Sequence, residues 1–215
     1  PVFAVTPLFP FTNFYELLAC ALLGVLCAPF SYFYVKFYEK TEKSFAHFKV
    51  NNAFKPAIGG LLTGLLILAY PEVAGGDFTA VGNLFTNLLP TTFLGVMMLL
   101  GIVLAKIIAT GFTVGSGGSG GVFGPSLFIG GFLGAAFAGI FEIIFPGLLR
   151  VPEAMILVGM GAFFAGAAKA PIAGVVMVCE MTGSYSLLPG LLMSSVMHIA
   201  FSRSWSIYKS QVKNK

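Results

Sequence analysis

The sequence predicts an all-α, polytopic membrane protein built from broken and tilted helices. Hydrophobic residues make up 57% of its 215 residues and charged residues only 9%, with a mean hydropathy of +0.93. Soluble domains carry about 25% charged residues. A helix needs about 20 apolar residues to cross a bilayer, and many apolar runs here are interrupted by Gly or Pro. Because broken helices in membranes commonly frame transport sites, the pattern favours a transporter or channel.

The first half of the chain is expected to hold four helical segments. Residues 14–34 form a first span with aromatic side chains at both ends, where lipid headgroups lie. A polar loop follows over 36–55, and residues 56–70 then form an apolar helix that barely crosses a bilayer. A shorter helix at 78–89 precedes a long span at 91–112, which leads into a glycine-rich loop.

Four further helices are expected after that loop. Residues 122–141 contain small residues of the kind that let transmembrane backbones approach closely: Gly130, Gly131, Gly134, Ala135 and Gly139. Residues 153–165, 171–181 and 187–201 are apolar, and the first two are too short to span upright. We see no soluble domain or low-complexity linker in the sequence, and therefore expect one membrane domain over 1–215.

The basic residues indicate topology rather than contacts with nucleic acid. The net charge is +4, but the lysines lie at the ends of apolar segments and lack interleaved aromatic residues that would stack on bases. The positive-inside rule predicts that the loop at 36–55 and the C-terminal tail are both cytoplasmic. Three cysteines in apolar runs, Cys20, Cys27 and Cys179, lack metal-ligand spacing. They indicate buried free thiols, and we expect no metal or other cofactor.

The most informative motif is the stretch 115–125, Gly-Ser-Gly-Gly-Ser-Gly-Gly-Val-Phe-Gly-Pro. The first N–H groups of the helix that follows have no partner within the helix, and the helix dipole adds about half a positive charge there. The amides of Val122, Phe123 and Gly124 are therefore expected to be free, while Pro125 lies where a missing N–H costs nothing. Such a helix end attracts anions. The preceding glycines leave no side chain in the way and permit positive φ; they are Gly115, Gly117, Gly118, Gly120 and Gly121.

Two enzyme-like motifs overlap the same stretch. Gly-x-Gly-x-x-Gly begins at Gly115, but no predicted strand precedes it, which argues against a dinucleotide fold. Gly-x-Ser-x-Gly is also present, and an intramembrane serine protease with a Ser119 and His198 dyad is an alternative. A lone histidine on an apolar helix is more often a satisfied structural residue. We therefore do not expect an enzyme.

Polar residues inside apolar segments leave two interpretations open. Glu180 either serves function or bonds to backbone donors near a helix end, and Lys106 either extends to an interface or lines a cavity. Lys169 is expected to extend to an interface. Trp205 and Tyr208 are typical of aromatic anchors at the headgroup level. The alternative for Tyr208 is that its phenol donates to an anion.

The glycine-rich stretch and several other segments resemble the CLC family of chloride channels and chloride/proton exchangers. Gly121 to Pro125, Gly-Val-Phe-Gly-Pro, is similar to the family's Gly-x-Phe-x-Pro filter motif, and the Gly-Ser-Gly-Gly-Ser-Gly run before it also matches. Other stretches resemble the family in the same order: 55–60, 71–73, 159–162, 170–174, 180–183 and 206–208. The resemblance implies that the fold is one inverted repeat of a CLC-type bundle.

The resemblance also implies a function, which is anion transport through a voltage-gated channel or an antiporter. The amides of Val122 and Phe123 would bind chloride, and the hydroxyl of Tyr208, on a final short helix, would close the site from the cytoplasmic side. The filter loop would comprise Gly117, Gly120, Gly121, Gly124 and Pro125, with Gly124 where the family commonly has Ala. The family also implies a homodimer in which each protomer has its own pore.

The resemblance covers essentially this whole chain but only about the second half of the family's membrane domain. An N-terminal half is therefore expected to supply the other filter motifs, the serine of the ion site and the glutamates for gating and proton transfer. The residues here do not distinguish channel from exchanger, or chloride from nitrate. A structural alternative is a non-conducting assembly half whose loop serves only helix packing.

Overall fold

The described part of the chain is entirely helical in its regular structure, as predicted. The computed structural model describes residues 13–74, 79–86, 89–90 and 92–208. In chain order its elements are α1 (Phe14–His47), α2 (Lys55–Ala69), the short 3-10 helix η1 (Pro71–Val73), α3 (Thr79–Thr86), α4 (Phe93–Gly115), α5 (Phe123–Ile144), α6 (Ala154–Ala168), α7 (Pro171–Thr182) and α8 (Leu188–Phe201). Among the described residues, three helices are long and apolar enough to cross a membrane, namely α1, α4 and α5.

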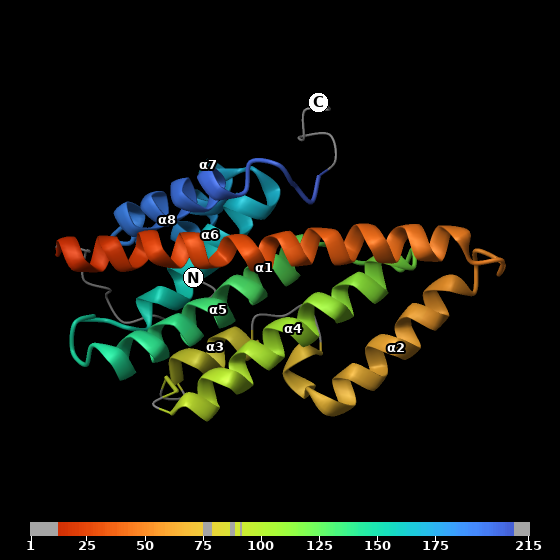
Figure 1. Cartoon of the computed structure of the whole chain (residues 1–215), viewed down its shortest axis with the longest axis horizontal. Helices are drawn as coiled ribbons and strands as arrows, with labels where there is room; N and C mark the ends of the chain where they lie inside the picture. The colour runs from red at the N-terminus through yellow and green to blue at the C-terminus, as the bar shows by residue number, and fades with distance from the viewer. Residues whose placement is uncertain (1–12, 75–78, 87–88, 91, 209–215) are drawn as a thin grey trace.

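The helices are arranged around the long rod of α1 (Figure 1). In this view α2 to α5 lie on one side of α1, and α6 to α8 lie on the other. α5 packs most extensively against α6, and α1 packs chiefly against α8, α4 and α6. The start of α5 is therefore held between α1, α4 and α6.

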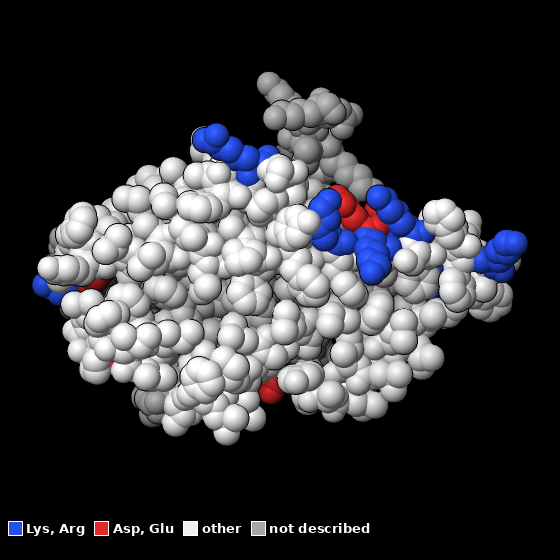
Figure 2. Space-filling view, in the orientation of Figure 1, with Lys and Arg blue, Asp and Glu red and all other residues white. Residues whose placement is uncertain are grey.

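The first helix differs from its expected form. We predicted a span at 14–34 followed by a loop over 36–55, but α1 continues to His47, and only residues 48–54 separate it from α2. Lys and Glu are good helix formers, and Lys36 and Glu39, three residues apart on the helix, form an ion pair at 3.0 Å. The 34-residue helix is about 51 Å long, well beyond the ~30 Å hydrocarbon core. Figure 2 shows basic side chains gathered over its C-terminal half.

The remaining boundaries lie within about three residues of their predictions. α4 begins at Phe93, where the Thr92 side chain accepts a hydrogen bond from the backbone N–H of Gly95, and it continues to Gly115. α5 begins at Phe123 with Val122 as its N-cap and continues to Ile144. α3 occupies most of the expected helix at 78–89, and residues 78, 87 and 88 lie outside the described part of the chain.

The predicted small-residue face of α5 is confirmed as a packing surface. A Cβ atom added to Gly134 would lie 2.1 Å from the carbonyl oxygen of Met155, and one added to Gly130 would lie 2.3 Å from that of Gly159. Real Cβ atoms do not approach backbone this closely, so the backbones of α5 and α6 are in direct contact. Close approach of this kind is how small residues hold transmembrane helices together.

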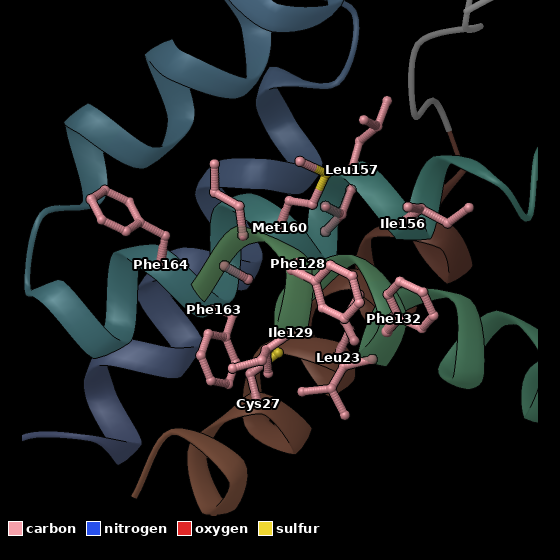
Figure 3. Close-up of a cluster of buried hydrophobic side chains, with 14 of the residues drawn as sticks. Leu23, Cys27, Phe128, Ile129, Phe132, Ile156, Leu157, Met160, Phe163 and Phe164 are labelled. Atoms are coloured by element: carbon pink, nitrogen blue, oxygen red, sulfur yellow. The ribbon is translucent and has the colours of Figure 1, made fainter. Parts of the chain in front are cut away.

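An apolar core surrounds this contact (Figure 3). Phe128 and Phe132 of α5 stack with their ring centroids 4.3 Å apart, and they lie among side chains of α6 such as Met160. Leu23 and Cys27 bring α1 into the same cluster. All three cysteines are buried, as predicted. The core thus fixes the position of α5 relative to both α1 and α6.

Candidate functional site

The glycine-rich loop reverses the chain between α4 and α5. The N–H of Gly117 donates to the carbonyl of Val114, and the N–H of Gly118 donates to that of Thr113, both at 3.0 Å. Gly117 has a φ of +88°, a conformation that side chains other than glycine's rarely adopt. A Cβ on Gly118 would lie 2.6 Å from the Thr113 carbonyl oxygen. Two of the loop glycines are therefore required by backbone geometry.

The start of α5 presents backbone donors, as predicted. No side chain caps the helix, and within the described residues no acceptor takes the N–H groups of Val122, Phe123 or Gly124. Pro125 has no N–H, and the first intrahelical bond runs from the Ser126 N–H to the Val122 carbonyl at 3.2 Å. A helix end with free amides favours negative charge.

Aromatic side chains fix this helix end. The ring of Phe123 meets Phe164 of α6 edge to face, with centroids 5.0 Å apart. The hydroxyl of Ser126 donates to the Phe123 carbonyl at 2.6 Å. The phenol of Tyr34, which is fully buried in α1, donates to the Val122 carbonyl at 3.1 Å. Local sequence patterns do not predict this last contact, because the two residues are 88 positions apart.

Tyr208 lies on an irregular segment rather than on a helix. The final short helix that we expected around it is absent from the described residues 202–208. The segment is instead bound to the end of α6, where the N–H of Ile207 donates to the carbonyl of Ala167 at 2.9 Å. Tyr208 is 41% exposed. Because Phe164 of α6 contacts Phe123, the segment that carries Tyr208 is bound to the same helix that contacts the α5 start.

A cavity of about 480 Å³ adjoins the loop on the side of α4. Its lining includes Lys106 together with Gly120, Gly121, Gly124 and Pro125. Lys106 is 5% exposed, so it lines a cavity and does not extend to an interface. Its ammonium donates to the carbonyl of Val73 at 2.9 Å and lies 4.6 Å from the centroid of the Phe128 ring.

Comparison with known proteins decides the family to which the chain belongs. The model of the voltage gated chloride channel family matches residues 1–203. The chain belongs to this family. It is 35% identical over 196 residues to the voltage-gated ClC-type chloride channel ClcB of Salmonella typhimurium, a match that covers 90% of this chain and 45% of that protein. It is also 37% identical to ClcB of Salmonella typhi over 172 residues, covering 79% of this chain and 40% of that protein.

An Escherichia coli ClcB is 34% identical over 196 residues, again 90% of this chain and 45% of the relative. The chain therefore spans less than half the length of these CLC relatives. As a CLC protein with several apolar helices, it is an integral membrane protein. The family match ends before Tyr208.

In this CLC chain Ser119 and His198 do not form a dyad. His198 is fully buried, and its two ring nitrogens lie 2.7 Å from the Ser31 hydroxyl and 2.7 Å from the Ala162 carbonyl oxygen. Ser119 is exposed at the loop. We accordingly expect no labelling of Ser119 by a serine-reactive fluorophosphonate on the folded protein. Labelling that disappears in Ser119→Ala would contradict this expectation.

Two other polar residues in the CLC chain have structural partners. Glu180 accepts a hydrogen bond from the phenol of Tyr185, which is a structural partner other than the backbone donors considered in one of its two interpretations. The ammonium of Lys169 turns inward to the carbonyl and hydroxyl of Ser202, so the expected extension to an interface is wrong. Lys169 ends α6 in the left-handed region, with φ of 55°.

Proposed function

We propose that the complete protein transports chloride across the membrane, as a channel or as a chloride/proton antiporter. Family membership and the names of the relatives support anion transport as the activity. The observation that carries the proposal is the start of α5, where free amides lie in an apolar protein behind a glycine-rich loop. Donors of this kind can replace part of the hydration shell of an anion.

In this proposal the amides of Val122 and Phe123 bind chloride, and the Tyr208 phenol closes the site from the cytoplasmic side. The loop glycines and Pro125 form the filter around the ion. The residues near 36–55 and the C-terminal tail face the cytoplasm, because lysines concentrate there. The ligand is chloride itself, and no further cofactor takes part.

The chain, residues 1–215, acts as the C-terminal half of a CLC membrane domain and requires the N-terminal half to complete the pore. Its match to less than half of each relative supports this division. Exposed apolar side chains on α2, among them Leu61 at 67% and Leu68 at 81%, offer surface for lipid or for the other half. Following the family, we expect two such domains to form a homodimer with one pore each.

Chloride efflux from liposomes tests the transport function. We expect efflux when the protein is purified from its native membrane with any subunit it retains, and none from empty vesicles. Loss of efflux in a variant of the filter loop, with the protein still folded, places the pore in this chain. Efflux that is insensitive to every change at the α5 start would identify the chain as a non-conducting assembly half.

The phenol of Tyr208 has its own test. In Tyr208→Phe we expect chloride affinity to fall about tenfold, because a hydrogen bond to an anion is worth ~1.5 kcal/mol or more. Calorimetric titration with chloride measures the change. Tyr185→Phe serves as the matched control, since that phenol bonds to Glu180 instead. Equal chloride affinity in Tyr208→Phe and the wild type would remove Tyr208 from the site.

A further inference from the structure

Two residues on one face of α1 contact the two parts of the candidate site, which are the start of α5 and the segment that carries Tyr208. Tyr34 bonds to the start of α5, and Ser31 bonds to Trp205, three residues before Tyr208. Residues three apart on a helix lie on the same face. We propose that α1 is the positioning element of the anion site, with Tyr34 orienting the Val122–Phe123 peptide and Ser31 anchoring the segment that carries Tyr208. This inference rests on the function proposed above.

The bond from Tyr34 acts on one particular peptide unit. The carbonyl of Val122 and the N–H of Phe123 belong to the same planar group, in which the two bonds of a trans peptide point in opposite directions. A donor that holds the carbonyl therefore directs the N–H away from α1. The same carbonyl also accepts the Ser126 N–H at 3.2 Å. Two donors on one carbonyl polarise the peptide, which makes its N–H a stronger donor to an anion.

The environment of Tyr34 allows little freedom to its phenol. The side chain is fully buried, and its ring lies 6.0 Å from that of Phe163, centroid to centroid. A fully buried hydroxyl needs a partner, and the Val122 carbonyl provides it at 3.1 Å. The length and packing of Tyr34 thus determine where that peptide lies.

The second contact is part of a network of hydrogen bonds. The Ala162 carbonyl can only accept, so the Nδ1 of His198, 2.7 Å away, carries a proton. The His198 Nε2 lies 2.7 Å from the Ser31 hydroxyl, which also lies 2.9 Å from the Ala28 carbonyl of its own helix. The indole N–H of Trp205 donates to that same hydroxyl at 3.1 Å. Ser31 therefore joins α1, α8 and the terminal segment in one arrangement.

The terminal segment has little other freedom. The Trp205 ring meets Tyr32 of α1 edge to face at 5.1 Å, and Ile207 bonds to the end of α6. Tyr208 follows directly. A rotation or shift of α1 would accordingly move the Val122–Phe123 peptide and the Tyr208 backbone together. The position of one helix therefore determines the positions of both.

The variant Tyr34→Phe tests the first contact, because it removes only the hydroxyl. We expect chloride affinity, measured by calorimetry on the complete protein, to fall about fivefold. The affinity ratio of chloride to nitrate should also change, since a reoriented amide affects a spherical and a planar anion differently. A purely structural loss would reduce the active fraction for both anions and leave that ratio unchanged. Tyr15→Phe, which alters an exposed tyrosine at the far end of α1, is the matched control.

The variant Trp205→Phe tests the second contact, because it keeps a ring against Tyr32 and removes the indole N–H. We expect a drop in chloride affinity of similar size, and this variant decides the inference if Tyr34→Phe does not fold. Wild-type affinity and selectivity in both variants would overturn the positioning role while leaving the proposed function intact. A wild-type protein that binds no chloride would instead overturn the proposed function.

Discussion

Replacing Val122 by Asp is expected to lower chloride affinity at least tenfold, which corresponds to ~1.4 kcal/mol. Val122 is the N-cap of α5, where no side chain now accepts a hydrogen bond. A carboxylate at an N-cap bonds to the N–H of the second or third helical residue and is favoured by the helix dipole. Here the third residue is Pro125, so the carboxylate would take the N–H of Gly124. The protein would then carry its own anion at the site.

The neutral variant Val122→Asn separates charge from shape. Asparagine can also accept a hydrogen bond at an N-cap, but its side chain is neutral and does not repel chloride. The chloride affinity of Val122→Asn should therefore lie close to that of the wild type. Calorimetric titration and anion efflux at matched protein amounts would measure both variants. Equal chloride affinity in Val122→Asp and Val122→Asn would show that the anion does not bind at the start of α5.

The substitution Gly134→Ala is expected to destabilise the protein by about 3 kcal/mol. The new methyl group would lie 2.1 Å from the Met155 carbonyl oxygen, and backbone on both helices would have to separate. The separation would also disturb the contact at Gly130, one turn earlier. Thermal unfolding in detergent, followed by the loss of monodisperse protein, measures the effect.

Gly64→Ala is the matched control for this prediction. That glycine is in α2 with no heavy atom within 4 Å of the position of a Cβ. Alanine is favoured over glycine in a helix by about 1 kcal/mol, so this variant should be as stable as the wild type or more so. A melting temperature for Gly134→Ala equal to that of Gly64→Ala would mean that α5 and α6 do not meet at their backbones.

The sequence predicts those features of the fold that depend on local rules. Pro171 begins α7 and Gly183 ends it in the left-handed conformation, both as the positional preferences of Pro and Gly require. The positive φ that the loop glycines permit is found at Gly117, and the small residues of α5 pack against α6 as predicted, because both features require a missing side chain.

Features that depend on tertiary contacts could not be predicted in this way. The extension of α1 was missed because charged residues were taken to indicate a loop, although their helix propensity is high. The contacts of Ser31 with Trp205 and of Tyr34 with Val122 join residues that are 174 and 88 positions apart. Tyr208 follows a segment held by contacts with other elements, such as the bond from the Ile207 N–H to the Ala167 carbonyl, so local rules do not predict where Tyr208 lies.

The direct contact between the backbones of α5 and α6 limits how a transport cycle can operate. At Gly130 and Gly134 no side chain separates the two backbones, and no rotamer change can open that contact, so we expect the two helices to move together. Packed interfaces change between discrete arrangements and do not slide continuously. Opening and closing would then fall to groups outside the α5–α6 pair. Mutations intended to alter gating belong there, whereas mutations in the seam should affect the yield of folded protein.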